Sequence, residues 1–582
     1  MADGGCLMSM KKKKTLRLIL KIIAGTLVFL MLAASLVFAA GYFYYGKIVR
    51  RYVVEFVKKD SRGLYSADIG SVYINLLGGN ITIRDFSLTP DTALYRRKLP
   101  GDTLPPMLFR LNIKYLRVED FRFLQALRKH EIVISGIGIH EPEITVFRMY
   151  KKPHTSSADT GKQSMSIPLP AGLKSVAIGE LLFARGTLDF YDLTGDTLVH
   201  QCIPSCSVSI KNVMVDSVHS RKSRLFNSDD ITIVVNGFSV KTGNGMNLLS
   251  FGEIGLSTGK SSGYIRNFHL VPQYGMYEYS RKFGFQTDRL DITVPLLSMT
   301  RIDFSQLIFE GKLSAGLLEI DGLVVDDFRD KRIPRKPGLR PAMPQEALRR
   351  LKTCVRIDSV VLRNGKAVYA EQTGPRPGTV FFSDMSATLT GLTNDTALLQ
   401  AGLVSELKGT ANLMGKGKMN FNMKFRVGDK QNGFIYSSSL GPMDLREVNP
   451  MLTRLMPAEI SSGKGRELLV QQIVANDDEA LGKLVFTYSD LHIKISSNEK
   501  SIWSDIKTGV IGFVANSFVV NVANPTGAGK LNTGVVYFKR DKEKGIINFI
   551  WKSVLSGLKS QMGFNSKEQK ELKKKAAAGH KR

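Results

Sequence analysis

The pattern of apolar and polar positions divides the chain into a helical beginning, a long β-rich body and a helical end. From Ile22 to Tyr45 an apolar run contains no charged residue, and it is long enough to cross a bilayer as a helix. From residue 65 onward, apolar and polar residues alternate in short segments, which is typical of half-buried strands. We therefore expect a mostly β fold that follows one N-terminal transmembrane helix and contains a few short helices.

The apolar run can also be interpreted as a cleaved signal peptide, since Val37 and Ala39 suit a signal peptidase. We favour an uncleaved anchor, because a signal-peptide core is usually only about 7 to 15 residues long. Basic residues flank the run equally, but a short N-terminal tail usually stays inside and a long domain is translocated largely regardless of its charge. We expect residues 1–21 in the cytoplasm, a single-pass helix over 22–45, and the bulk of the chain across the membrane.

The segment that follows, residues 46–64, has the pattern of an amphipathic helix. Its apolar positions Val49, Val53, Phe56 and Val57 have near-helical spacing and are surrounded by basic residues. Such a helix suits the headgroup layer of a membrane. It also suits a helix that caps the sheet that follows, and the two interpretations are compatible.

The β-rich body aligns with itself in an order that is preserved over about 150 residues. The matching segments are 70–90 with 252–272 and 176–192 with 355–371, the second pair placing Gly186 on Gly365. We infer duplication of a whole β unit, with a first repeat over residues 65–250 and a second over 251–408, although convergent strand patterning imitates parts of such a match. Repeats of this kind extend in one direction, so we expect an elongated body.

Two polar, proline-containing segments, residues 151–166 and 331–344, lie at equivalent places in the two repeats. We expect both to be surface loops. The second is strongly basic, so contact with anionic headgroups is the alternative to a simple solvated loop.

Charge and cysteine content narrow the class of partner. The formal net charge is +29, which attracts polyanions or anionic lipid headgroups. Because the basic residues are spread among strands or gathered at termini and linkers, with no recognisable nucleic-acid module, we expect no nucleic-acid partner. The four cysteines are too few for a disulfide scaffold. Cys202 and Cys206 are close enough in sequence to bridge across a turn, but we expect two ordinary thiols.

Motifs for catalysis are weak. Gly255 to Gly259 matches GxSxG around Ser257, yet a nucleophile elbow needs a helix after it, and here a loop and another strand follow. The overlapping GLSTGKS is one residue too short for a phosphate loop. The eight histidines are scattered singly, without the spacing of metal ligands. We expect no catalytic residue, metal or cofactor, and a chain that is not an enzyme.

From Gly433 the chain reads GFIYSSSLGPMDLREVNPMLTRLMPAEISSGKGRELLVQQIVAND, and later YSDLHIKI, FVVNVANP and the helical INFIWKSVLSGLKSQMG. This region, residues 409–545 with the helix after it, resembles the C-terminal region of AsmA-like envelope proteins, where strands precede a short helix and an I-x-S-G return to β. The matching positions are Leu445, Asn449, Pro457, Ile460 and Gly463. With the N-terminal anchor, the resemblance extends over nearly the whole chain, but it rests on pattern and order rather than on one motif.

The resemblance implies a bacterial inner-membrane anchor, a periplasmic body of repeated strands curled into a long open groove, and a role in the lipid homeostasis of the outer envelope. A curved sheet with one apolar face and no opposing layer would hold acyl chains while headgroups stay in water. We expect phospholipids and the inner-membrane bilayer as partners, with envelope proteins as further candidates. The candidate groove residues, each equally suited to a core, are Ile81, Ile83, Ile132, Ile134, Ile231, Ile233, Val360 and Leu362.

The alternative function is a periplasmic scaffold that assists outer-membrane protein assembly by pairing its strand edges with client strands. Residues 546–582 bear on both functions, because they combine a helical apolar face with a basic tail. The face consists of Ile546, Ile547, Phe549, Ile550, Val554 and Leu558. Three interpretations of this helix are open: it docks on a membrane, it plugs the end of the groove, or it packs on the last strands. We favour packing on the last strands.

Overall fold

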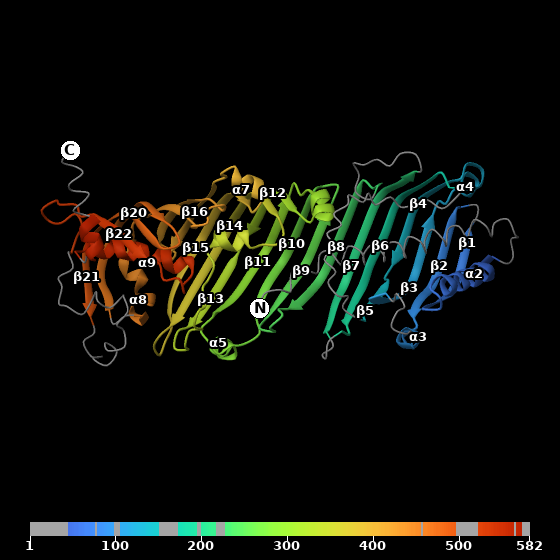
Figure 1. The fold of residues 1–582 in the computed structure, drawn as a ribbon, viewed down its shortest axis with the longest axis horizontal. Helices are drawn as coiled ribbons and strands as arrows, with labels where there is room; N and C mark the ends of the chain where they lie inside the picture. Colours follow the sequence, from blue (N-terminus) through green and yellow to red (C-terminus); the bar gives the residue numbers. More distant parts are fainter. Residues whose placement is uncertain are drawn as a thin grey trace. The chain divides into compact units, whose positions relative to one another are not determined.

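The fold of the chain is mostly β (Figure 1). The computed structural model describes residues 45–75, 78–97, 105–149, 173–194, 199–216, 227–455, 458–495, 522–563 and 566–572. Apart from Tyr45, the expected transmembrane segment lies outside these residues, as do the tail before it and the loop over 151–166. Within the described part, no helix has the length and apolar character needed to cross a membrane.

All 22 strands of the described residues belong to one sheet. They are β1 (Tyr65–Asn75), β2 (Asn80–Pro90), β3 (Met107–Glu119), β4 (Glu131–His140), β5 (Glu143–Arg148), β6 (Ser175–Asp192), β7 (Val199–Asp216), β8 (Asp230–Lys241), β9 (Asn247–Ser257), β10 (Ser262–Pro272), β11 (Asp288–Thr300), β12 (Leu313–Asp321), β13 (Val324–Asp330), β14 (Val355–Gln372), β15 (Gly378–Thr393), β16 (Ser405–Leu413), β17 (Gly417–Phe425), β18 (Phe434–Leu440), β19 (Met443–Asp444), β20 (Ala458–Ala475), β21 (Glu479–Ile495) and β22 (Gly534–Lys539).

The longest helices of the described residues are α2 and α9, with 16 residues each, and the others are short turns between strands. They are α2 (Tyr45–Asp60), α3 (Thr92–Arg97), α4 (Phe123–Lys129), α5 (Glu278–Phe283), the π-helical turn η3 (Gln306–Glu310), α6 (Pro344–Arg349), α7 (Thr396–Gln400), the 3-10 turn η4 (Leu445–Val448), α8 (Asn449–Leu455) and α9 (Ile546–Gln561).

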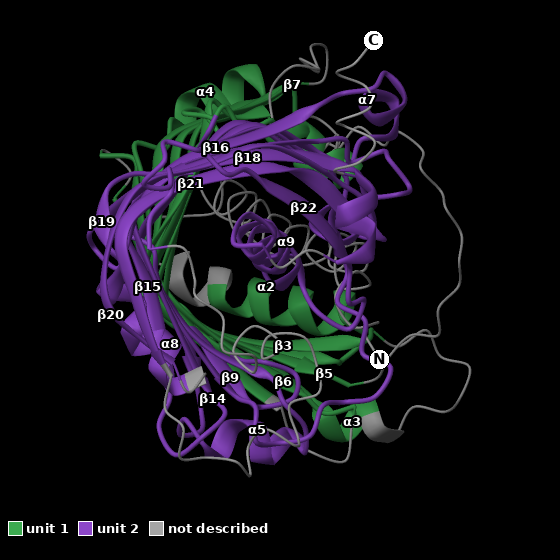
Figure 2. Ribbon diagram, turned by 90° about the vertical axis from the view of Figure 1, so that its left-hand side faces the viewer, with its two compact units in different colours: residues 1–240, 250–266, 301–311 green, residues 241–249, 267–300, 312–582 purple. Residues whose placement is uncertain are grey.

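The chain divides into two compact units, which Figure 2 colours separately. Unit 1 comprises residues 1–240, 250–266 and 301–311, and unit 2 comprises residues 241–249, 267–300 and 312–582. Strands β1–β7 therefore belong to unit 1 and β11–β22 to unit 2, whereas β8, β9 and β10 contribute residues to both.

In unit 1 one long strand lies beside a strand that is broken in two. β3 pairs antiparallel with both β4 and β5, and each of these pairs in parallel with the 18-residue β6. The break occurs at Glu141, which has a φ of 48°, and at Pro142, since proline cannot donate a hydrogen bond to a ladder. Antiparallel pairs join β1, β2 and β3 before the break, and β6, β7 and β8 after it.

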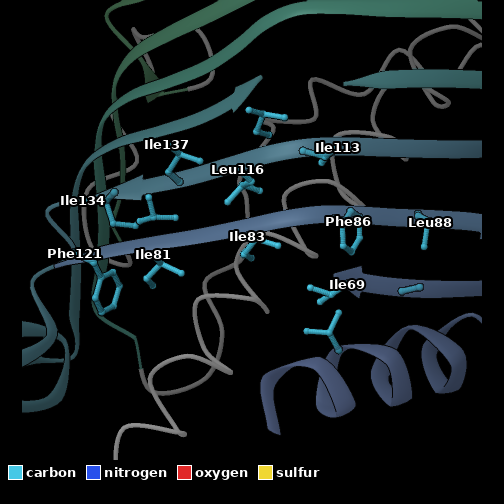
Figure 3. Packing of buried hydrophobic residues seen from close by; sticks show 14 of the residues in the cluster. Ile69, Ile81, Ile83, Phe86, Leu88, Ile113, Leu116, Phe121, Ile134 and Ile137 are labelled. Carbon is cyan, nitrogen blue, oxygen red and sulfur yellow. The ribbon is translucent and has the colours of Figure 1, made fainter. Parts of the chain in front are cut away.

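Alternation along these strands gives unit 1 one buried apolar face. On β2, Ile81 and Ile83 are buried, whereas Arg84 is exposed. Helix α2 packs against β1, beside Ile69 in Figure 3, and its Val53 and Val57 belong to the same apolar cluster. The amphipathic helix expected over residues 46–64 therefore caps the sheet, and its contact with a membrane stays a prediction.

Unit 2 repeats this arrangement of strands. β11 pairs antiparallel with β12 and β13, and both pair in parallel with the 18-residue β14. The break between β12 and β13 is at Gly322, which has a φ of 73°. From β14 onward, antiparallel pairs join β15, β16, β17, β18, β20, β21 and β22 in that order.

Helix α9 packs on the end of unit 2, within the curve of its strands (Figure 2). Phe549 is 2% exposed and lies edge-on to Phe434 of β18, with the ring centroids 6.1 Å apart. Ile547, which the sequence pattern assigns to the same apolar face of the helix, is instead 77% exposed. A helix packed on the last strands is thus what the structure shows, with one expected core residue turned outward.

The expected basic loop, residues 331–344, is not simply solvated. Arg340 forms an ion pair with Asp477 at 3.0 Å, and Lys331 forms one with Glu371 at 2.5 Å. Met343 is fully buried in the cluster under α9. Most of the loop's specific contacts are therefore with its own unit, which leaves fewer of its charges for anionic headgroups.

A glycine bulge occupies the same place in the long strand of each unit. Gly186 on β6 and Gly365 on β14 each sit at a shift in register with the next strand. Each follows a residue with positive φ, Arg185 at 52° and Asn364 at 55°. These two glycines are the pair that the sequence alignment superposes. A duplicated unit accounts for the match in strand order, pairing and bulge position, and the duplication itself stays a prediction.

Candidate functional site

One side of the unit 2 sheet carries a row of apolar side chains that crosses several strands. Register partners on neighbouring strands point to the same side of a sheet, and adjacent residues of one strand point to opposite sides. One ladder of partners crosses β14, β15, β16, β17, β18 and β20 through Val360, Leu389, Leu407, Met423, Tyr436 and Ile473. The adjacent ladder, on the opposite side, runs through Val361, Thr388, Lys408, Asn422 and Ser437. The first side is apolar and the second is mostly polar.

Only one end of the apolar ladder is buried. Tyr436 and Ile473 lie under α9 and are 5% and 0% exposed. Val360, Leu389 and Leu407 are half-buried and belong to none of the buried clusters of the described chain. A contiguous apolar surface that remains accessible is typical of a binding site.

Unit 1 carries a similar ladder on the strands after its core. Phe183 of β6 pairs with Val208 of β7, which pairs with Ile233 of β8. The neighbouring ladder leads from Leu181 to Ile231 in the same way. All of these side chains are half-buried. Leu181 and Phe183 pack against the buried cluster of unit 1, so the ladders lead from this core to half-buried apolar side chains on β7 and β8.

The eight groove candidates divide between core and accessible surface. Ile81, Ile83, Ile132 and Ile134 are at most 5% exposed and lie in the buried cluster to which α2 contributes Val53 and Val57. Figure 3 shows Ile81, Ile83 and Ile134 in this cluster. The other four are half-buried on the two open ladders or beside them: Ile231, Ile233, Val360 and Leu362. Alternation in sequence identifies the apolar side of a strand, but the elements that pack on that side decide which part of it stays open.

A row of polar side chains interrupts the apolar side of unit 2 beyond the bulge of β14. We call Asp288, Asp327, Arg329, Tyr369 and Glu371 the polar row. Adjacent strands place its members opposite one another, Asp288 with Arg329, Asp327 with Tyr369, and Arg329 with Glu371.

The row lies on the same side of the sheet as the apolar ladder. Ala367, two residues before Tyr369 on β14, pairs with Phe382, which pairs with Leu413 of β16. Leu413 and Leu407 are separated by an even number of residues on β16 and so point to the same side. The polar row therefore lies on the same side of the sheet as the apolar ladder, and Tyr369 is nine residues from Val360 along β14.

Most charges in the polar row are paired. The Nε and Nη2 atoms of Arg329 each donate a hydrogen bond to the carboxylate of Asp288. Glu371 accepts a hydrogen bond of 2.6 Å from the Tyr369 hydroxyl and pairs with Lys331 at 2.5 Å. Burial, followed by the charge of Glu371, raises the pKa of Tyr369, so this hydroxyl stays protonated and acts as a donor.

Asp327 is the exception. Its Oδ1 atom is buried and has no hydrogen-bond partner. Burial, and next the negative charge of Asp288, raise the pKa of Asp327 to about 7. A buried acceptor without a donor costs about 1–3 kcal/mol, so a ligand with an N–H or O–H group would relieve it.

Helix α9 contributes a cation near the same place. Lys552 is half-buried, and burial together with the charges of Lys544, Lys559 and Lys331 lowers its pKa to about 8, while Glu371 acts in the opposite direction. Lys552 has no ion-pair partner among the described residues. The sequence reasoning missed Lys552 and the polar row. The sequence does contain a signal for the polar row. Val325, Asp327 and Arg329 occupy alternate positions of one strand, and two of the three are charged, whereas the apolar sides of the other strands carry mostly apolar residues.

The GxSxG motif forms a structural turn. Ser257 is the last residue of β9, 8% exposed, and its hydroxyl donates to Asp230 Oδ1 at 3.0 Å. The backbone N–H of Gly259 donates to the same oxygen at 2.8 Å, and that of Lys260 to the Ser257 hydroxyl at 3.1 Å. The turn leads directly into β10, so the Asp230 carboxylate that accepts from Ser257 is part of the turn, and no described histidine hydrogen-bonds to this hydroxyl. The described residues hold no group of three metal-ligating side chains.

The three cysteines in the described part of the chain are free thiols. Cys206 pairs with Gly186 and Cys202 with Asp189, on either side of the bulge, which places the two thiols on opposite sides of β7. At about 3.3 Å per residue they are also roughly 13 Å apart along the strand, too far for a disulfide. Burial raises the pKa of both thiols.

The positions that carry the resemblance to AsmA-like proteins form one local contact set, apart from Pro457, which lies outside the described residues. The side chain of Asn449 donates to the carbonyl of Ile460 at 2.9 Å and accepts from its N–H at 3.0 Å. Leu445 is buried, and a Cβ at Gly463 would lie 3.2 Å from its side chain. This set fixes the start of β20 against η4 and α8.

No protein-family model and no curated protein sequence matches the chain.

Proposed function

We propose that this protein is a non-enzymatic component of the bacterial cell envelope that binds phospholipid on its apolar sheet surfaces and conducts it between membranes. The observation that carries the proposal is the ladder of Val360, Leu389 and Leu407, which is apolar, half-buried and backed by a polar side. Each acyl CH₂ group removed from water on such a surface contributes about 0.8 kcal/mol. The surface therefore suits a ligand with long acyl chains, and binding it requires no bond to be made or broken.

Three further features support a lipid ligand over a small polar one. The described residues contain no metal-ligand group, and the one serine in a hydrolase-like motif is held in a turn. The apolar ladder and the polar row lie on the same side of β14, roughly 30 Å apart along the strand, so a long acyl chain would extend from the row toward the ladder. The expected anchor over residues 22–45, and with it an inner-membrane location with a periplasmic body, is part of the proposal.

A photocrosslinking experiment in cells tests the proposal. A photoreactive amino acid is placed at Leu389 on the apolar side of β15 or, as the matched control, at its neighbour Thr388 on the opposite side. Lipid adducts at position 389 and none at 388 are expected. Equal lipid labelling at both positions would count against a specific surface. Adducts with outer-membrane proteins in place of lipid would favour the alternative function as an assembly scaffold.

Deletion of the gene provides a second test of the proposed function. If the protein conducts phospholipid, the distribution of phospholipid between the two membranes should change, and the wild-type gene but not a Leu389→Asp, Leu407→Asp variant should restore it. Thr388→Asp, Lys408→Asp is the matched control, because these positions lie on the polar side of the same two strands. An unchanged lipid distribution in the deletion strain would overturn transport.

A further inference from the structure

The charges around the polar row leave one acid and one base without an ion pair. Asp288 is paired with Arg329 and Glu371 with Lys331. Asp327 and Lys552 remain, and neither makes an ion pair with any described residue. Both sit partly buried beside an apolar surface, where an unpaired charge is costly. A ligand with one positive and one negative group would pair with the charges of Asp327 and Lys552 at the same time.

Asp327 and Lys552 both lie in the neighbourhood of Glu371. Asp327 lies opposite Tyr369, and Glu371 is two residues farther along the same strand. Diagonal neighbours of this kind are about 7–8 Å apart, and Lys552 is close enough to Glu371 for the carboxylate to influence its pKa. A single ligand at this place would have its phosphate at the flexible Lys552 side chain and its ammonium group at Asp327.

We propose that the polar row and Lys552 bind the headgroup of a phospholipid that carries a primary ammonium, with the ammonium at Asp327 and the phosphate at Lys552. This inference rests on the proposed function and names its substrate class. A primary ammonium donates N–H hydrogen bonds, so it satisfies the unpartnered Oδ1 of Asp327. A trimethylammonium group has no N–H to donate. A glycerol headgroup has a hydroxyl but no positive charge to offset Asp327.

The full-length protein in detergent micelles provides a direct test, with fluorescence as the signal. Trp551 is adjacent to Lys552 and 56% exposed, and a Trp503→Phe background removes the other tryptophan of the chain. Dihexanoyl phospholipids with ethanolamine, choline or glycerol headgroups are titrated as probes. We expect the ethanolamine lipid to bind about ten-fold more tightly than the other two. Asp327→Asn should abolish this preference, and Lys552→Gln should weaken all three.

Asp326→Asn is the matched control, because Asp326 is exposed on the opposite side of β13. It should keep the preference for ethanolamine. Equal binding of the three lipids by the wild-type protein, or an unchanged preference in Asp327→Asn, would overturn the headgroup assignment and leave the proposed function standing. Failure of all three lipids to bind, also with longer acyl chains, would overturn the proposed function itself.

Discussion

Asp327 on β13 lies directly opposite Tyr369 on β14, so that a carboxylate and a phenol are neighbours on the apolar side of unit 2. The two do not hydrogen-bond, because the Tyr369 hydroxyl donates to Glu371 and Asp327 Oδ1 has no partner. Burial raises the pKa of both groups. The electrostatic cost of placing polar groups on this surface is therefore concentrated at Asp327.

This cost predicts that Asp327→Asn stabilises the protein at high pH. An unfolded aspartate titrates near pH 4, whereas in the folded chain the pKa of Asp327 is about 7. Between these pH values the unfolded chain has lost the proton that the folded chain retains, so Asp327 makes stability fall as the pH rises from about 4 to about 7. Asparagine does not titrate. The free energy of unfolding at pH 8 should rise by on the order of 2–4 kcal/mol.

Urea unfolding at pH 8 and pH 4.5, followed by the fluorescence of Trp551 in the Trp503→Phe background, measures this effect in unit 2. Most of the gain should be gone at pH 4.5, because this pH is close to the pKa at which the unfolded aspartate also binds its proton. Asp326→Asn, on the exposed side of the same strand, should change the free energy by less than about 0.5 kcal/mol. A loss of stability at pH 8 in Asp327→Asn would mean that its carboxylate has a favourable partner.

The sequence predicts the strands and aligns Gly186 with Gly365, because both inferences depend on local signals, whereas the bulge at each glycine is found only in the structure. Alternation marks β2, and the aligned Gly186 and Gly365 mark a position where the strand geometry changes. What covers each apolar side depends on contacts distant in sequence. Val53 is buried against the strands of unit 1, whereas no comparable signal in the sequence shows that Leu389 remains half-buried. The sequence therefore identifies the side of the strand on which the groove candidates lie, but not how accessible each candidate is.

The bulge glycines differ in how closely their neighbours approach. A Cβ at Gly186 would lie 2.3 Å from a ring carbon of Phe183, whereas one at Gly365 would lie 3.0 Å from the Cβ of Met385. Gly186→Ala is expected to destabilise unit 1 by about 1–3 kcal/mol, and Gly365→Ala to have a smaller effect on unit 2. Hydrogen exchange of β6–β7 and of β14–β15 measures the two separately. Gly243→Ala, with no atom within 4 Å of the added Cβ, should change neither, and equal effects at both bulges would contradict the steric argument.

Asn449 is expected to stabilise the start of β20. Asn449→Ala removes both hydrogen bonds to the backbone of Ile460 and leaves these backbone groups with fewer partners, which should lower stability by about 1–3 kcal/mol. Faster amide exchange at the beginning of β20 and at α8 would report the loss. Asn420→Ala serves as the control, because it removes one exposed side-chain bond to Ser439 and should have little effect. Unchanged exchange in Asn449→Ala would show that the neighbouring apolar contacts suffice.

Helix α9 is held against the sheet through a close approach at Gly557, and this predicts a way to uncover the apolar surface beneath it. A Cβ at Gly557 would lie 2.5 Å from the side chain of Leu484 and 2.7 Å from that of Val536. Gly557→Val should therefore separate α9 from β21 and β22, raise the amide exchange of residues 546–561 by at least ten-fold, and expose more apolar surface to lipid. Ile547→Val, at a position that is 77% exposed, changes the helix without touching this contact and should leave exchange unaltered.

If Gly557→Val leaves α9 protected, the contacts around Phe549 rather than the close approach at Gly557 must hold the helix in place. If α9 is released and binding of dihexanoyl phospholipid increases, the helix limits access to the end of the apolar ladder, because Tyr436 and Ile473 then join its open part.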